Sequence, residues 1–247
     1  MCAAKKRKGK KNFNWLRGAL VISICCVLLA AFKVFGPNTG SFAHDECLYI
    51  HTGATYRDVK ITLRSRGFVN DMLSFDLLAK PARLADRIHP GKYTITPGMS
   101  NFSIIRMLRS GRQTPVKLVI NKLRTKQDFI RLVSTNLEAD SQSLKHLLTD
   151  NAYLSIFALD TNTVMCSIMP DTYEFYWNTN ADKAFRKIEK TYTHFWTDKR
   201  KALAQEHNIT PLQTIILASI VDEESNKNDE KPNIASVYLN RLQKGIR

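Results

Sequence analysis

Three consecutive acids follow an apolar stretch near the end of the chain, in the segment IILASIVDEESN (215–226). If this segment is a helix, the stripe of Leu217 and Val221 continues to Glu224, because these residues are spaced by four and three. Asp222 and Glu223 are then rotated roughly 200° and 100° away from Glu224. A carboxyl group on an apolar stripe loses solvation, so its pKa rises and it can hold a proton near neutral pH, as a general acid must. The alternative is a helix end whose acids face water.

The residues before the acids predict where that helix begins. Thr210 can be its N-cap, Pro211 fits the first helical position, and Gln213 can complete a capping box. Similar start and stop signals outline a chain of mixed α and β structure, without a long internal repeat. The expected strands lie at 48–50, 92–95 and 116–120, and the expected helices begin at 55, 71, 100, 125, 141, 210 and 232.

The start of the chain predicts a membrane anchor. Residues 1–17 hold seven Lys or Arg and no acid, and residues 18–31 carry no charge. The apolar run is short for a membrane span, which needs roughly 17–25 residues, but it extends to Phe35 if Lys33 snorkels to the interface. The positive-inside rule then places the N-terminus in the cytoplasm and the residues after about 37 outside.

A cleaved signal peptide is the alternative, with Ser41-Phe42-Ala43 as the cleavage site. This site lies several residues beyond the apolar core, so we favour an uncleaved, single-pass anchor in the inner membrane. The rest of the chain is then periplasmic or otherwise outside the cytoplasm.

The charge pattern points away from nucleic acid as a partner. The net charge is +15, but eight of the 37 basic residues precede residue 37, whereas all 22 acids follow it. The exported part carries 29 bases against 22 acids, a moderate excess that suits an anionic partner such as a cell wall or lipid head groups. We find no zinc spacing, no RNA-binding aromatic motif and no basic helix with heptads.

Cysteine and histidine spacing predicts neither a metal site nor a cofactor. Cys47 and Cys166 would be exported, where a disulfide is permitted, but two residues do not establish one. The six histidines are scattered, and no Cys/His cluster has metal-ligand spacing. A G-x-S-x-G elbow and a Gly-rich phosphate loop are also missing.

Four segments, in the same order, resemble the endolytic murein transglycosylases of the MltG (YceG-like) family. IMPDTYEF (168–175) resembles F-P-D-T-Y-x-F, and ASIVDEES (218–225) resembles ASIVEKET. KPNIASVYLNRLQKGI (231–246) resembles R-P-x-I-A-x-V-F-x-N-R-L-x-x-G-M, and HPGKYTITPGMS (89–100) is similar to A-G-x-Y-x-x-x-P-G-M-S in a LysM-like subdomain. The single N-terminal anchor is similar too, and the resemblance covers roughly residues 47–247.

The resemblance implies roles for particular residues. The family's catalytic glutamate corresponds to Glu224, which is also the acid that the apolar stripe selects, whereas Asp222 replaces a family glutamate and is not expected to be catalytic. Substrate-binding residues would be Asp171, Tyr173, Ser225 and Asn240. For Asp171 and Tyr173 a rigid turn that packs on the core is an equal alternative.

The implied fold class is α+β, with an N-terminal transmembrane helix, a small LysM-like subdomain and a mainly helical, incomplete transglycosylase-like domain. The predicted divisions are a basic tail (1–17), the anchor (18–36), a linker (37–46), the LysM-like subdomain (47–111) and the catalytic domain (112–247). The family pattern continues with L-Q-x-D-P-T-V after the last matched segment, so we expect a truncated product or a fragment.

The implied reaction is cleavage of the bond between N-acetylmuramic acid and N-acetylglucosamine in nascent peptidoglycan, with formation of a 1,6-anhydro ring that ends glycan elongation. The expected partners are glycan strands, the membrane and cell-wall synthesis proteins, and neither a metal nor an organic cofactor is needed. One alternative is a non-catalytic peptidoglycan-binding or scaffold module of the synthesis machinery. The other is a muramidase that delivers water, which would use two carboxylates.

Overall fold

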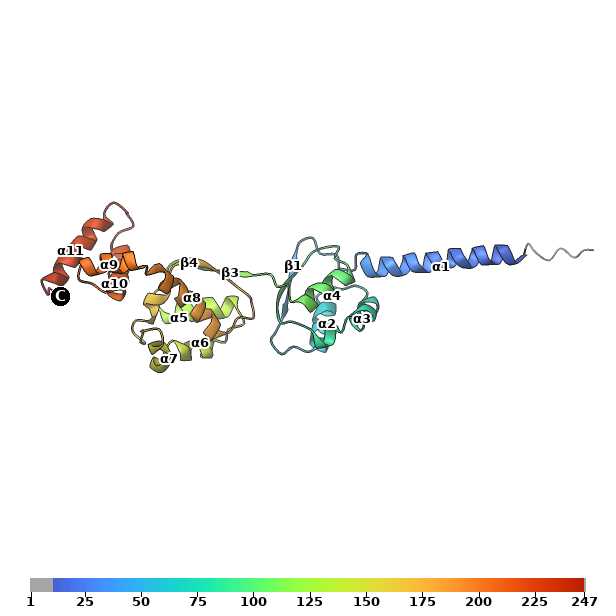
Figure 1. The fold of residues 1–247 in the computed structure, drawn as a ribbon, viewed down its shortest axis with the longest axis horizontal. Helices are drawn as coiled ribbons and strands as arrows, with labels where there is room; N and C mark the ends of the chain where they lie inside the picture. Colours follow the sequence, from blue (N-terminus) through green and yellow to red (C-terminus); the bar gives the residue numbers. More distant parts are fainter. Residues whose placement is uncertain (1–10, 247) are drawn as a thin grey trace, which may run out of the picture. The chain divides into compact units, whose positions relative to one another are not determined.

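The computed structural model describes residues 11–246, and the chain divides into two units, one up to Thr114 and one from Pro115. The fold is α+β, with helices and two small two-stranded sheets (Figure 1). Residues 1–10, which hold most of the predicted cytoplasmic tail, lie outside the described residues.

Helix α1 (Lys11–Phe35) contains the predicted anchor. Its apolar stretch, Arg17–Phe35, has 19 residues and a mean hydropathy of 2.4 over its best window, and none of that window is buried inside the protein. At 1.5 Å per residue the stretch is roughly 28 Å long, close to the hydrocarbon thickness of a bilayer. The helix is therefore long and apolar enough to cross a membrane.

The body of unit 1 is built on an antiparallel pair, β1 (Glu46–Ile50) and β2 (Gly91–Ile95), in which Leu48 lies opposite Tyr93. The strands alternate, so that one face is buried and the other faces solvent. Residues between and after the strands form the helical layer that covers the buried face. Its elements are α2 (Tyr56–Ser65), α3 (Met72–Ala79), η1 (Leu84–Asp86) and α4 (Asn101–Ser110).

A small polar cluster fixes the end of α1 to unit 1. The Asn38 side chain donates to Asn101 Oδ1 (2.6 Å) and accepts from the Asp71 backbone N–H (2.9 Å). Asn101 is fully buried and also donates to Ser74 Oγ (2.8 Å). Lys33 Nζ donates to Asp71 Oδ2 (2.7 Å), and this bond lowers the pKa of Asp71 to about 2. The helix and the domain are thus joined by more than the connecting chain.

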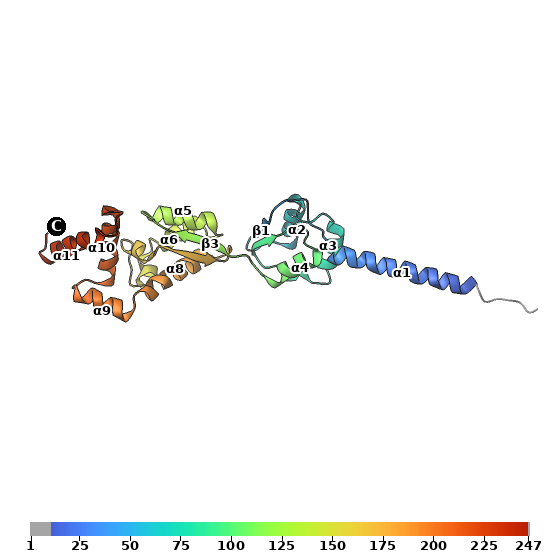
Figure 2. The same ribbon diagram turned by 90° about the horizontal axis from the view of Figure 1, so that it is seen from above.

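Unit 2 begins with the same kind of sheet, β3 (Val116–Ile120) paired with β4 (Asp171–Phe175). Helices α5 (Lys126–Asn136), α6 (Ser141–Leu147) and α8 (Ala181–Phe195) pack on its buried face (Figures 1 and 2). The other elements are α7 (Asn151–Ser155), η2 (Val164–Ser167), α9 (Asp198–Glu206), α10 (Pro211–Glu224) and α11 (Lys231–Gln243).

Unit 2 up to α8 repeats the body of unit 1. β3 and α5 begin 70 positions after β1 and α2, and η2, β4 and α8 begin 80 positions after η1, β2 and α4. α7, which has no counterpart in unit 1, falls between the two sets and accounts for the change in spacing. The two sheets have the same register, because Leu118 lies opposite Tyr173 as Leu48 lies opposite Tyr93.

The repeat extends to individual hydrogen bonds. Tyr93 donates to the carbonyl of His89 (2.7 Å), and Tyr173 donates to the carbonyl of Met169 (2.8 Å), four residues back in each copy. Burial raises the pKa of both phenols, to about 12 for Tyr93, so both remain donors. The capping boxes are also shared: each helix that follows the first strand begins with Thr and has Asp three residues later.

Most elements expected from caps are confirmed, including the capping box at Thr210 and the strand at 116–120. We expected no long repeat from the sequence, but the structure contains a repeat of elements. The two copies share few residue identities, because their buried positions need only apolar side chains of suitable size. Strand β4 and helices α8 and α9 were not anticipated, and the LysM-like assignment of unit 1 stays a prediction.

The polar cluster at the end of α1 generates a stability prediction. Asn101→Leu removes two hydrogen bonds of this buried side chain, one with the Asn38 amide and one with the Ser74 hydroxyl, so it should destabilise unit 1 by about 1–3 kcal/mol. Urea unfolding of the detergent-solubilised protein measures this loss. Ser65→Ala, which removes only an exposed hydroxyl, is the control and should change little. Equal stability of Asn101→Leu and wild type would show that the cluster contributes nothing.

Candidate active site

The three acids lie at the end of α10, and two of them are paired with cations. Asp222 accepts from Lys231 (2.7 Å), and Lys122 lies 3.8 Å from its other oxygen. Glu223 contacts Lys122 (2.9 Å) and Arg124 (3.2 Å). These partners, Lys231 for Asp222 and Lys122 for Glu223 above all, lower the pKa of both carboxyl groups. Asp222 and Glu223 are therefore held as carboxylates in ion pairs.

Glu224 has a different partner. The phenol of Tyr238, on α11, donates to Glu224 Oε1 (2.7 Å), and this bond raises the pKa of Tyr238. The Arg241 guanidinium lies 5.9 Å from the centre of the Tyr238 ring. Among the residues that the structure describes, no cation forms an ion pair with Glu224. It is thus the one acid of the three whose charge is not already neutralised by a neighbour.

Glu224 lines a cleft of about 520 Å³ within unit 2. One wall is α10, with Ile215, Ser219 and Ile220 besides the two glutamates, and the facing wall comes from the segment after β3 and from η2. That facing wall consists of Leu123, Arg124, Met165 and Cys166. The cleft combines an apolar lining with one acid and a cation–acid pair, which is the composition of a binding site for a polar molecule with apolar faces.

The expected desolvation of Glu224 is absent. Leu217 and Val221 are buried, but Ile220 is 37% exposed and the Glu224 side chain faces solvent. The reason is that η2 packs on the middle turns of α10, whereas Glu224 is its last residue and lies beyond that contact. The apolar stripe predicted the helix face correctly but not the depth to which its end is covered.

Asp171 and Tyr173 lie on β4, not in the cleft. Asp171 is exposed and pairs with Ile120, so it lies at the strand end from which the segment carrying Arg124 starts. Tyr173 is only 4% exposed, and its hydroxyl is held by the Met169 carbonyl. Because Tyr93 makes the same bond in unit 1, this position has a structural role in the repeat.

Ser225 and Asn240 are the other predicted substrate-binding residues. Ser225 caps the end of α10, donates to Glu230 Oε2 (2.7 Å) and accepts from the Lys227 backbone (3.1 Å), so it shapes the turn between α10 and α11. Asn240 is exposed on α11. It is two residues from Tyr238 and therefore points to a different side of that helix. Neither residue lines the cleft that contains Glu224.

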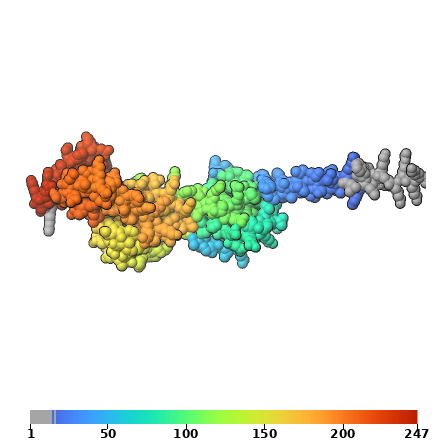
Figure 3. Space-filling model, viewed as in Figure 1, coloured from blue at the N-terminus to red at the C-terminus, as the bar shows by residue number. Residues whose placement is uncertain are grey.

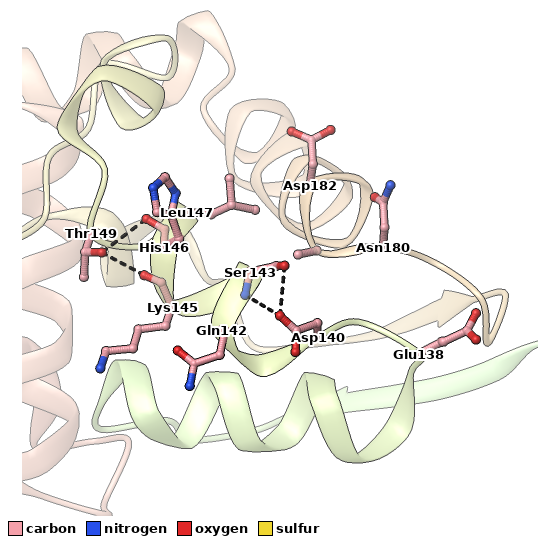
Figure 4. Close-up of a pocket in the computed structure, with 11 residues that line it drawn as sticks. Glu138, Asp140, Gln142, Ser143, Lys145, His146, Leu147, Thr149, Asn180 and Asp182 are labelled. Atoms are coloured by element: carbon pink, nitrogen blue, oxygen red, sulfur yellow. Dashed lines mark hydrogen bonds between the residues drawn. The ribbon is translucent and has the colours of Figure 1, made fainter. Parts of the chain in front are cut away.

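A larger hollow, of about 920 Å³, lies elsewhere in unit 2, between α6 and α8 (Figure 4). Two of its three acids, Asp140 and Asp182, are engaged in local structure. Asp140 is the N-cap of α6 and accepts from the Ser143 backbone (2.7 Å), and Asp182 accepts from Arg186 and from the Tyr153 hydroxyl (both 2.8 Å). Because these carboxylates serve the fold, we assign the acid chemistry to the Glu224 cleft.

Sequence reasoning missed four residues around the acids, namely Lys122, Arg124, Lys231 and Tyr238. The two cations after β3 lie about a hundred positions from the acids they pair with, so no local pattern connects them. Tyr238 carried one signal, because it stands where the resembled family pattern has phenylalanine. The extra hydroxyl is the group that reaches Glu224.

In the described part of the chain, Cys47 and Cys166 are both free. No group of three or more His, Cys, Asp or Glu side chains is arranged to hold a metal ion among the same residues. Burial raises the pKa of the Cys166 thiol, so this cleft residue is not an activated thiolate. The chemistry available in the cleft is that of carboxylates and a phenol.

The site is thus a cleft in an α+β fold, lined by a carboxyl group whose partner is a phenol and not a cation. The profile of the YceG-like family matches residues 48–247, and the chain belongs to this family. Comparison with curated proteins gives no match. Among solved structures, a YceG-like protein from Listeria monocytogenes is similar, with 21% identity, coverage of 83% of this chain and 73% of that chain, and a TM-score of 0.49.

The position of Tyr173 generates a prediction that separates folding from binding. Tyr173→Phe removes one hydrogen bond and should cost about 0.5–1.5 kcal/mol of stability, whereas Tyr173→Ala opens a core cavity and should cost about 3–5 kcal/mol. Tyr93→Phe is the matched control in the other copy and should behave like Tyr173→Phe. Urea unfolding gives the stabilities, and co-sedimentation with purified glycan strands gives the binding. A loss of binding by Tyr173→Phe without a loss of stability would assign this residue to the substrate.

Proposed function

We propose that the protein is a membrane-anchored lytic transglycosylase that cleaves peptidoglycan glycan strands, with Glu224 as its acid–base residue. Membership of the YceG-like family suggests this activity. The assignment to Glu224 rests on the different partners of the three acids. Asp222 and Glu223 are paired with cations, whereas Glu224 lines the cleft and is held by a neutral phenol.

A single carboxyl group is enough for this reaction. Protonated Glu224 donates its proton to the glycosidic oxygen, and the bond from that oxygen to the anomeric carbon of N-acetylmuramic acid breaks. The resulting carboxylate takes the proton of the C6 hydroxyl of the same sugar, whose oxygen then bonds to the anomeric carbon. The proton balance is closed, no water is consumed, and the product ends in a 1,6-anhydro ring.

The neighbours of Glu224 support this role in the proposal. Tyr238 donates to Oε1 and so orients the side chain, and we assign the transferred proton to Oε2. Lys122, Arg124 and Lys231 form ion pairs with the other two acids. They therefore do not pair with Glu224 and do not stabilise its ionised form. Met165 and Cys166 supply an apolar wall against which a sugar face can pack.

The anchor is the second part of the proposal. The exposed apolar face of α1 needs a lipid environment, and the basic residues before it favour a cytoplasmic N-terminus. Both units would then be exported, next to the nascent strands. A membrane tether would confine cleavage to glycan close to the membrane.

Glu224→Gln tests the catalytic assignment. The amide keeps the shape and the hydrogen bond from Tyr238 but cannot exchange a proton, so cleavage by the native, membrane-anchored protein should slow by about 10²–10⁴-fold. Mass spectrometry of digested strands should show new ends lighter by one water than reducing ends. Asp222→Asn is the matched control and should lose much less, because its carboxylate is bound by Lys231.

Three outcomes of that experiment would contradict the proposal. Full activity of Glu224→Gln would show that another group supplies the proton. A wild-type protein that binds strands but does not cleave them would favour a non-catalytic wall-binding module. New ends that are all reducing would indicate a muramidase that delivers water.

A fusion experiment tests the topology. A reporter that works only outside the cytoplasm, fused after Gly111, should be active and should sediment with the membrane. The physical reason is the charge pattern around α1, with basic residues before the apolar stretch and none of the 22 acids before residue 37. A soluble, shortened fusion that begins near His44 would instead show that a signal peptide is cleaved.

A further inference from the structure

Three large apolar side chains of unit 1 are exposed around the end of α1. Leu73 and Leu77, on α3, are 85% and 74% exposed, and Phe102, on α4, is 44% exposed. Leu73 and Leu77 are four residues apart and lie on the same side of their helix. The Phe102 ring contacts Phe35, the last residue of α1, at 5.4 Å between ring centres. Figure 3 shows α3 at the surface of unit 1, beside the end of α1.

Hydrogen bonds set the level of these side chains along α1. Lys33 lies two residues before the end of the apolar stretch, and its ammonium group is bonded to Asp71, the N-cap of α3. The backbone carbonyl of Lys33 accepts from Asn101, the first residue of α4 (3.4 Å). The first turns of α3 and α4 are thus held at the height where the apolar stretch ends.

The second copy of the repeat provides an internal comparison. The Asp N-caps of α3 and α6 each accept a hydrogen bond from the backbone N–H of a Ser three residues later. This shared feature sets which residues of the two helices correspond. In this alignment Gln142 and His146 replace Leu73 and Leu77, and Asp182 replaces Phe102 (Figure 4). The same surface is therefore polar in the copy that carries no apolar helix. The apolar residues belong to the copy that is joined to α1.

The charges beside this surface suit phosphate head groups. The Arg106 guanidinium lies 5.9 Å from the centre of the Phe102 ring, and Lys80 and Arg83 are exposed just after α3. The acids of α3 are neutralised locally, since Asp71 is paired with Lys33 and Asp76 with Lys60. An apolar patch with a basic rim at the end of an apolar helix has the composition of a bilayer interface contact.

We propose that unit 1 rests on the lipid bilayer, with Leu73, Leu77 and Phe102 inserted at the boundary between head groups and acyl chains. The inference depends on the proposed anchoring by α1. Together with the polar cluster at Asn38, this contact sets the tilt of unit 1 against the membrane. The partner is the lipid surface itself, not a protein.

Depth-dependent quenching tests this contact in the full chain. The protein, with its native cysteines replaced by alanine, is reconstituted in vesicles of phosphatidylethanolamine with a minority of phosphatidylglycerol. An environment-sensitive fluorophore is attached at Leu73→Cys, at the equivalent Gln142→Cys, or at Cys25 retained alone. The label at 73 should shift to the blue and be quenched by lipids with a nitroxide near the head group. The label at 142 should behave as in water, and the label at 25 should be quenched by a nitroxide deep in the acyl chains.

A transplanted surface is the matched control. Leu77→His with Phe102→Asp places residues of the second copy beside the label at 73, and quenching there should be lost although the label at 25 remains quenched. Leu73, Leu77 and Phe102 are all exposed, so these changes leave the core of unit 1 intact.

The outcomes separate this inference from the proposal on which it depends. A label at 73 that reports water while the label at 25 is quenched overturns the contact and leaves the anchor intact. A label at 73 that is shielded but not quenched by lipid also overturns it and shows a protein cover instead. If the label at 25 is not quenched, the anchor itself is wrong, and the contact falls with it.

Discussion

A two-stranded antiparallel ribbon cannot bury a core by itself, and this constraint shapes both units. In each unit the two strands present their apolar residues on one face, and the segment between and after the strands must supply helices to cover that face. The tyrosine in the middle of the second strand closes the arrangement, because its buried hydroxyl needs a partner and finds a carbonyl four residues back. Two short strands and the helices that cover them thereby form a complete small domain. The same arrangement occurs in both units.

Local signals made much of this frame predictable. N-cap residues such as Thr55, Thr125 and Thr210 predict where helices begin. The reason is that the capping side chain lies within three residues of the free backbone N–H group that it satisfies. Strand β4 was not anticipated, since its inward residues Tyr173 and Phe175 could equally pack in a turn. The repeat was not predicted for a similar reason. The two copies share the positions of their helix caps and buried residues, but few identical amino acids.

The candidate site was predictable only in part. The spacing of Leu217, Val221 and Glu224 selected one acid, and the structure distinguishes the same acid by the absence of a cation among the described residues. Its exposure was not predictable, because solvation at a helix end depends on what packs there from other elements. Lys122 and Arg124 reach the acids through the fold alone, so a single sequence holds no trace of that pairing.

The repeat covers only part of unit 2. Helices α9, α10 and α11 have no counterpart in unit 1, so the acids lie outside the repeat, whereas the cations that pair with Glu223 lie inside it. At the corresponding places of the first copy stand Thr52 and Ala54, which carry no charge. The loop after the first strand is therefore free to vary without disturbing the sheet or its helices. In unit 2 this freedom gives the loop a second task, because its two cations tie the end of α10 to the repeated body.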